Sequence, residues 1–319
     1  MKSVRQPPQR ASTNWRRFKL RSAVVATLLL WAGAAEAETV LRVVMFSDLK
    51  FLDPIVSSAD PVRNHGYMIY DTLFSTDANG EIRPQMVDKT DVSPDQLTYT
   101  FTLRDGLYWH DGQPVTAEDC VASIKRWAVR DNVGQKLMTF VEAVTAKDKK
   151  TIEMRLKEPT GLVLRALGKP YANVPFMMPR RVAETSPFAQ ISDVTGSGPF
   201  VMNRSEWRPG DRLVYVRNPR YTPRAEPVSG LAGGKVVKVD RVETVAITDH
   251  LQAVNALLAG EVDFIEAPPH DLLPLLTADP NIRLWDLNSL GRQNFFRPNH
   301  LHAPFDNPKV RQALSLIHI

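Results

Sequence analysis

The spacing of apolar positions changes repeatedly along this chain and predicts short strands that alternate with helices. Residues 39–46 form a β-branched run that is typical of a central strand. Residues 97–103 alternate threonines with large apolar residues, which is typical of a strand with one buried face. Apolar residues recur at helical spacing in 62–74 and again in 250–258. The pattern therefore indicates a mixed α/β protein.

Turn and cap residues set the limits of these elements. Gly260 follows the helix predicted over 250–258 and can adopt the positive φ that ends many helices. A short buried strand is expected next, over 262–265, which completes an α/β unit. Thr116 begins a capping-box pattern for a helix that runs to about Val129. The other expected elements are loops or turns at 47–58, 80, 105–106, 111–112, 195–200 and 218–234, strands at 141–146, 151–156, 212–217, 236–247, 281–288 and 293–297, and a last helix capped by Asn307 with Pro308 at its first position.

The net charge of +5 comes from the N-terminal segment and not from a basic surface. Residues 1–37 carry seven basic residues and one acidic residue, so the remaining chain has 33 basic and 34 acidic residues. A nucleic-acid-binding protein needs a persistent positive face. We therefore expect no nucleic-acid partner.

Residues 1–37 have the three-part pattern of a secretory signal peptide. A basic stretch ends at Arg21, an apolar stretch of about 11 residues follows, and Ala35-Glu36-Ala37 places cleavage after Ala37. A membrane-spanning helix needs ~20 apolar residues, so an anchor fits less well. Arg16-Arg17 leaves export through the twin-arginine route open beside the general secretory route. A first mature residue of Glu38 does not fit a lipoprotein, which needs cysteine there, and the periplasm is the expected compartment.

The sequence shows no arrangement of residues that is typical of catalysis, so we expect a protein that is not an enzyme. Neither a nucleophile elbow, a zinc-protease motif, a phosphate loop nor a dinucleotide fingerprint occurs. Cys120 is the single cysteine and is expected to be a buried residue on a helix. His300 and His302 could share one face of a strand as a weak metal site, but the pattern fits exposed loop histidines better. His110-Asp111 fits a structural turn better than a catalytic pair. We expect no metal and no cofactor.

Eight stretches, taken in chain order, carry a family resemblance. They are residues 52–54, 70–74, 97–106, 109–119, 196–200, 217–221, 259–263 and 304–313. In this order they resemble the bacterial extracellular solute-binding proteins of family 5, and most of all the dipeptide- and oligopeptide-binding receptors. Most of these motifs are expected to be architectural, with the 109–112 turn setting a hairpin and residues 116–119 setting a helix.

The resemblance implies a fold and a domain organisation. The fold would be the α/β two-lobed periplasmic binding protein fold (type II, cluster C), with an incomplete second lobe. Residues 1–37 would be the signal peptide, 38–265 lobe I with an inserted subdomain, and 266–319 the hinge region and the start of a truncated lobe II. Family members run longer than this chain, so a C-terminal truncation is expected, together with weak ligand binding and marginal stability. The acidic residue that such receptors use for a peptide's amino group would lie in the missing part.

Two segments are the expected ligand contacts. Ligands of α/β proteins favour loops at strand ends, which indicates the loop after the first strand: Phe46, Ser47, Asp48 and Leu49. The second segment is Asn294, Phe295, Phe296 and Arg297, on a strand expected to cross the hinge. Arg297 would pair with a peptide carboxylate and the phenylalanines would form an apolar wall.

The resemblance also implies the function and the partners. The protein would be the periplasmic substrate-binding component of an ABC importer, a monomer that carries dipeptides or oligopeptides to permease subunits at the inner membrane. The same scaffold also carries non-peptide solutes such as nickel chelates, opines, haem or sugars, so that alternative stays open. A secreted hydrolase and a chemosensory receptor without transport are the remaining hypotheses.

Overall fold

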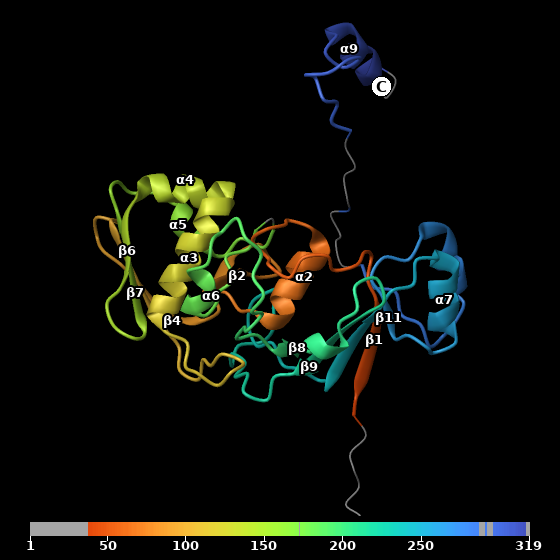
Figure 1. Cartoon of the computed structure of the whole chain (residues 1–319), viewed down its shortest axis with the longest axis horizontal. Coiled ribbons are helices and arrows are strands. Elements are labelled where there is room, and N and C mark those ends of the chain that lie inside the picture. The colour runs from red at the N-terminus through yellow and green to blue at the C-terminus, as the bar shows by residue number, and fades with distance from the viewer. Residues whose placement is uncertain (1–37, 172, 287–290, 292–295, 317–319) are drawn as a thin grey trace, which may run out of the picture. The chain divides into compact units, whose positions relative to one another are not determined.

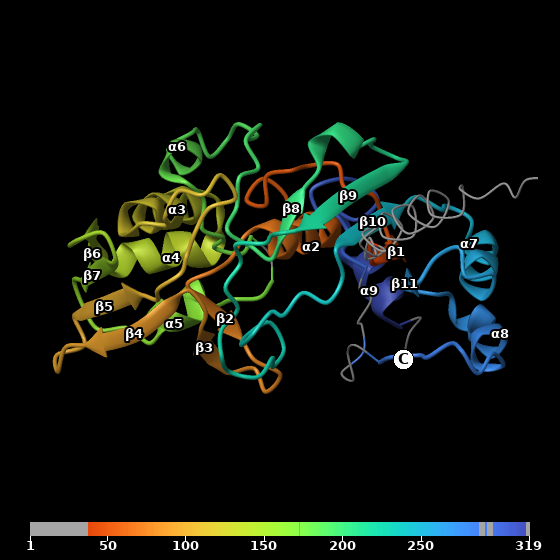
Figure 2. The same cartoon turned by 90° about the horizontal axis from the view of Figure 1, so that it is seen from below.

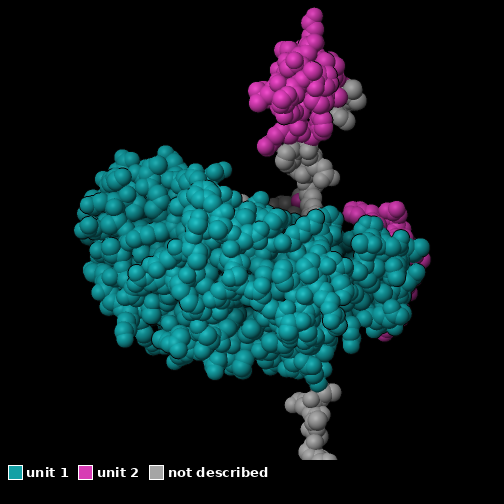
Figure 3. Space-filling model, in the orientation of Figure 1, with its two compact units in different colours: residues 1–268 teal, residues 269–319 magenta. Residues whose placement is uncertain are grey.

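The computed structural model describes residues 38–171, 173–286, 291 and 296–316. The chain divides into two compact units, residues 1–268 and residues 269–319, which are coloured separately in Figure 3. The predicted signal peptide, Asn294 and Phe295 lie outside the described residues. The division into lobes at residue 265 remains a prediction.

A five-stranded sheet of unit 1 contains the first strand of the described chain. Its order is β11-β1-β10-β9-β8, and β1 runs parallel to both of its neighbours. β9 is antiparallel to β10 and to β8. Helix α7 packs beside β1 and β11 through a small apolar cluster around Val44, Ala253 and Val262 (Figures 1 and 2). The elements of this part are β1 (Val40–Val44), α2 (Asp60–Ile69), α6 (Arg180–Ala183), β8 (Phe200–Met202), the 3-10 turn η1 (Arg204–Glu206), β9 (Arg212–Arg217), β10 (Arg241–Val245), α7 (His250–Leu258) and β11 (Phe264–Ile265).

A four-stranded antiparallel sheet with the order β4-β5-β7-β6 forms the other end of unit 1, and α2 lies between the two sheets (Figures 1 and 2). The alternation in β5 puts Tyr99, Phe101 and Leu103 in the core. Thr116 makes the predicted capping box with Asp119 at the start of α3. Cys120 is buried on the same helix. The elements here are β2 (Phe74–Thr76), β3 (Ile82–Pro84), β4 (Val87–Val92), β5 (Thr98–Leu103), α3 (Ala117–Arg130), α4 (Asn132–Phe140), β6 (Val141–Ala146), β7 (Thr151–Leu156) and α5 (Leu162–Leu167).

Unit 2 is helical wherever it is described with regular structure. It contains η2 (His270–Leu272), α8 (Leu273–Thr277) and α9 (Pro308–Leu316). Asn307 caps α9 as predicted, since its Oδ1 accepts a hydrogen bond from the Lys309 N–H at 2.9 Å. The strands predicted over 281–288 and 293–297 are wrong for the residues that are described there, 281–286 and 296–297. Alternating residues form a strand only when a neighbouring strand pairs with them.

Helix α2 ends at Ile69, five residues before the end predicted at Phe74. The segment 196–198 explains the difference, because it packs directly against the last turn. The Gly198 N–H donates to the Ile69 carbonyl oxygen at 2.9 Å, and a Cβ on Gly196 would lie 1.7 Å from the same oxygen. A helix that continued would need this carbonyl for its own next turn, so the chain becomes extended at Tyr70.

Two strands are shorter than predicted because of their neighbours. β10 covers only Arg241–Val245 of the predicted 236–247, since its partner β9 supplies five paired positions, Arg212 to Val216. β11 covers only Phe264–Ile265 and lies at a sheet edge, where 39% of the Phe264 surface is exposed. The prediction of a buried strand over 262–265 therefore holds for Val262 alone, which is 4% exposed.

Candidate functional site

The carboxyl ends of β1 and β11 meet at one edge of the five-stranded sheet. Val43 pairs with Phe264 and Val44 with Ile265 in parallel register, so the segments that follow both strands leave the sheet side by side. The Glu266 N–H donates to the Val44 carbonyl oxygen at 2.9 Å and extends this pairing by one step. Ligands of open α/β sheets bind outside the carboxyl ends of the strands. The loop predicted from the sequence, residues 46–49, lies at this edge.

Three of the four residues in this loop have exposed side chains. Phe46 is 61% exposed, Ser47 and Asp48 are also exposed, and Leu49 is 4% exposed. Leu49 packs into the apolar core beside α2. A ligand at this edge can therefore contact the side chains of residues 46–48, whereas the Leu49 side chain packs in the core.

Neighbouring elements fix the loop in place. Glu266 Oε2 accepts a hydrogen bond from the Phe46 N–H at 2.9 Å, and Glu266 Oε1 accepts one from Asn64 Nδ2 at 3.2 Å. Asp48 Oδ2 accepts one from the Gly210 N–H at 2.8 Å. Sequence reasoning did not select Asn64 or Glu266. Glu266 could have been found as a ligand-site candidate because it is a polar residue directly after a predicted short strand.

The main chain of the loop keeps hydrogen-bonding groups for a ligand. Within the part of the chain that the structure describes, the N–H groups of Ser47, Asp48 and Leu49 have no protein acceptor. An extended peptide can pair with such groups as an added strand would. The loop therefore combines a main-chain donor surface with an exposed aromatic ring.

An aromatic side chain also projects beside α2. Tyr171 is 69% exposed, and the Arg63 guanidinium lies 5.2 Å from the centre of its ring. Arg63 Nη1 pairs with Asp60 Oδ1 at 2.9 Å, so the cation is fixed against the ring. Asn64, which contacts Glu266, is the next residue on the helix.

The Asp53 of the 52–54 motif makes a buried ion pair. Arg126 on α3 donates from Nη1 to Asp53 Oδ1 at 3.2 Å and from Nη2 to Asp53 Oδ2 at 2.7 Å. The Arg126 side chain is 2% exposed and that of Asp53 is fully buried. Arg126 Nη2 also donates to the carbonyl oxygens of Ser186 and Ala189. The motif thus fixes the segment that joins β1 to α2 against α3.

The residues of the 109–112 turn are used within the fold. His110 Nδ1 accepts a hydrogen bond from the Gly196 N–H at 3.1 Å, and burial lowers the pKa of His110 to about 4. Asp111 accepts a hydrogen bond from the Gln113 N–H and pairs with Arg181 at 3.1 Å. These contacts leave His110 and Asp111 as parts of a structural turn.

The second predicted segment belongs to unit 2. Phe296 is 71% exposed, and its ring contacts that of Phe305 edge to face at a centroid distance of 5.8 Å. Arg297 is exposed as well. His300 and His302 lie in an exposed turn, and no group of three metal-ligating side chains occurs among the described residues.

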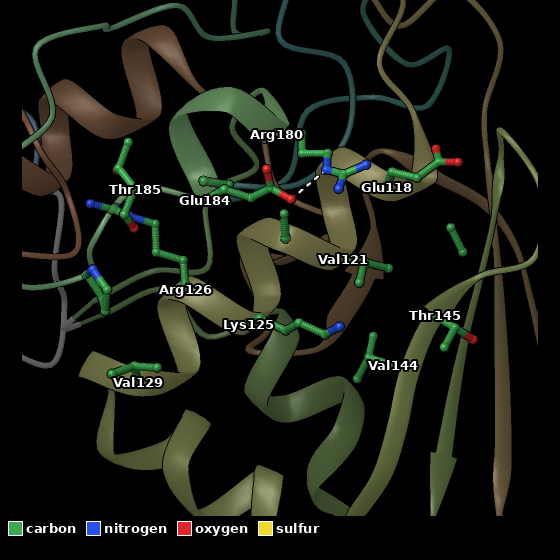
Figure 4. Close-up of a pocket in the computed structure, with 14 residues that line it drawn as sticks. Glu118, Val121, Lys125, Arg126, Val129, Val144, Thr145, Arg180, Glu184 and Thr185 are labelled. Atoms are coloured by element: carbon green, nitrogen blue, oxygen red, sulfur yellow. Dashed lines mark hydrogen bonds and ion pairs between the residues drawn. The ribbon is translucent and has the colours of Figure 1, made fainter.

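A separate surface cleft of about 560 Å³ lies between α3, β6 and α6 (Figure 4). Val121, Val129 and Val144 give it apolar walls, and the ion pair between Arg180 and Glu184 lies at its rim. None of the predicted ligand contacts lines it. No helix in the described part of the chain is long and apolar enough to cross a membrane.

Comparison with known proteins gives a match over most of the chain. The model of the family described as bacterial extracellular solute-binding proteins, family 5 Middle, matches residues 81–317. A "Probable peptide ABC transporter periplasmic-binding protein y4tO" of Sinorhizobium fredii (strain NBRC 101917 / NGR234) is 44% identical over 292 residues, which cover 91% of this chain and 54% of that protein. The chain spans about half the length of the curated relatives that it matches.

Solved structures show the same fold. A dipeptide-binding protein from Pseudoalteromonas sp. SM9913 in complex with Met-Leu has a TM-score of 0.67 and 18% identity, and covers 86% of this chain and 56% of its own. MoaA from A. tumefaciens R10 in complex with mannopinic acid has a TM-score of 0.67 and 23% identity, with 87% and 55% covered. The fold predicted from the sequence, that of the type II periplasmic binding proteins, is confirmed. Since a peptide and an opine receptor match equally well, the fold leaves the cargo open.

Proposed function

This chain belongs to the bacterial extracellular solute-binding proteins of family 5, and from that premise we propose that it serves an ABC importer as a periplasmic receptor for short peptides. The observation that carries the proposal is the loop 46–49 at the carboxyl ends of parallel strands, where the N–H groups of Ser47, Asp48 and Leu49 have no acceptor among the described residues. The name of the relative from Sinorhizobium fredii supports a peptide cargo.

The ligand contacts follow from the chemistry of the two predicted segments. The N–H groups of residues 47–49 pair with the peptide main chain, which makes recognition tolerant of side chains. The Phe46 ring packs on one apolar side chain of the ligand. In the second segment, Arg297 pairs with a carboxylate of the ligand, Phe295 and Phe296 form an apolar wall, and Asn294 is a further contact.

The cargo is bound and released without chemical change, and the partners are ABC permease subunits at the inner membrane. The protein acts as a monomer in the periplasm after cleavage behind Ala37. N-terminal sequencing of the protein from a periplasmic extract tests the export step, with Glu38 as the expected first residue. An uncleaved N-terminus in the cytosolic fraction would contradict it.

Titration calorimetry of the exported protein with Met-Leu, trialanine and mannopinic acid tests the cargo. We expect both peptides to bind and to be recovered with unchanged mass. Phe46→Ala should weaken peptide binding about tenfold, because an exposed ring that a ligand covers contributes on the order of 1–2 kcal/mol. Phe188→Ala removes another exposed phenylalanine, 71% accessible, and should leave the affinity unchanged. Binding of mannopinic acid alone would assign the non-peptide alternative, and a cleaved peptide would assign a hydrolase.

A further inference from the structure

Glu266 holds a carboxylate in a fixed position at the proposed site. Its N–H donates to the Val44 carbonyl oxygen, its Oε2 accepts from the Phe46 N–H at 2.9 Å, and its Oε1 accepts from Asn64 Nδ2 at 3.2 Å. These contacts come from the end of β1 and from α2. The side chain of this half-buried residue is thus held by two hydrogen bonds and its main chain by a third before any ligand arrives.

The charge of this carboxylate is not balanced within the described residues. Both of its protein donors are neutral, and no lysine, arginine or histidine of the described part pairs with it. Two fully buried carboxylates of unit 1 differ in this respect. Asp53 pairs with Arg126, and Asp71 pairs with Lys235 at 2.8 Å.

A carboxylate has about four acceptor positions on its two oxygens, and the protein fills one on each oxygen of Glu266. The remaining positions have no protein donor among the described residues, and the carboxylate lies against the Phe46 N–H at the start of the loop 46–49. A fixed carboxylate with acceptor positions left over is suited to an ammonium or guanidinium group, which gains a charge-assisted hydrogen bond.

We infer that Glu266, held by Asn64 and by the main chain of Phe46, determines specificity by selecting ligands with a cationic group at this edge. The inference rests on the proposed function, since it assumes that the ligand lies against the loop 46–49. The cation is either the amino terminus of a peptide or a basic side chain. The chemistry is the same in both cases, and matched ligands separate them.

Two pairs of peptides carry the test, with the affinity ratio within each pair as the readout. Trialanine against its N-acetyl form reports on the amino terminus. Ala-Lys-Ala against Ala-norleucine-Ala reports on a basic side chain. For one of these pairs we expect the wild-type protein to prefer the cationic member about 10- to 100-fold, the usual value of a charged hydrogen bond.

Glu266→Gln should remove that preference while the neutral member of the pair keeps its affinity within about threefold. Asn64→Ala should reduce the preference by a smaller factor, because the carboxylate stays but loses one of its supports. Glu261→Gln makes the same change at an exposed residue of the preceding turn and should alter no ratio. Circular dichroism melts of each variant verify that it is folded.

Three results would overturn the inference in different ways. If Glu266→Gln weakens both members of a pair equally, the residue only supports the loop. If wild-type protein shows no preference in either pair, Glu266 does not contact a ligand cation. If none of the four peptides binds to wild-type protein, the proposed peptide function fails, and this inference fails with it.

Discussion

The buried ion pair between Asp53 and Arg126 gives the sharpest prediction about stability. Arg126→Met removes the guanidinium and leaves the Asp53 carboxylate without a cation in a fully buried position. Its remaining partner there is the Ile55 N–H at 3.2 Å. Breaking a buried pair in this way costs about 3–5 kcal/mol, because one uncompensated charge stays in the interior. That cost is a large part of the 5–15 kcal/mol by which a typical domain is stable.

The double variant separates charge burial from packing. Asp53→Leu/Arg126→Met removes both charges and keeps apolar volume, so it should recover at least about 2 kcal/mol relative to the sum of the two single variants. The hydrogen bonds from Arg126 to the carbonyl oxygens of Ser186 and Ala189 are lost in both variants that carry Arg126→Met. The double variant should therefore regain only part of the lost stability. The assay is urea denaturation followed by tryptophan fluorescence, with the slope of the transition verified for each variant.

Either of two outcomes would contradict this prediction. A loss below about 1 kcal/mol for Arg126→Met would mean that the pair is not buried as described. A double variant whose loss equals the sum of the single losses would mean that the two side chains do not interact.

Three further predictions concern the same unit. Gly196→Ala should prevent stable folding or cost more than about 3 kcal/mol, measured by thermal melting, because its Cβ would lie 1.7 Å from the Ile69 carbonyl oxygen. Burial lowers the pKa of His65 to about 3 and that of His110 to about 4. As the pH falls from 6.5 to 4, these histidines therefore take up protons in the unfolded state before the folded state. The free energy of unfolding should then fall by up to about 1.4 kcal/mol per pH unit for each histidine. Urea titrations at pH 7, 6 and 5 measure this slope, and a constant free energy would contradict it. Thr116→Ala should cost about 1 kcal/mol in the same assay through loss of the α3 cap, whereas a gain in stability would contradict the capping box.

Local patterns predicted local structure well. The alternation in 98–103, the capping box at Thr116, the Gly260 turn and the cap at Asn307 each depend on residues within one or two turns of chain. The physical causes, which are side-chain alternation, capping hydrogen bonds and positive φ, act at short range. They can therefore be read from the sequence.

Long-range partners account for the parts that the sequence did not predict. The end of α2 at Ile69 is set by Gly198, and the partner of Asp53 lies 73 residues away on α3. The strands predicted after residue 280 lack any paired neighbour in their described parts. No local sequence pattern indicates the end of α2, the partner of Asp53 or the missing strand pairing.

The candidate site shows the same limit. Residues 46–49 were selected because a loop at a strand end suits a ligand, and the loop does lie at the carboxyl ends of β1 and β11. Which of its side chains face outward was not predictable, and Leu49 packs inward. Asn64 and Glu266 are 18 and 220 residues from Phe46 in the sequence, so only the sheet register and the packing of α2 bring the three together.

The most direct test of the proposed ligand site is to map a bound peptide on the exported protein by amide NMR during titration with trialanine. We expect saturable shifts of the Ser47, Asp48 and Leu49 amides, and recovery of intact peptide at the end of the titration. Shifts confined to the cleft between α3, β6 and α6, or conversion of the peptide to smaller products, would contradict it.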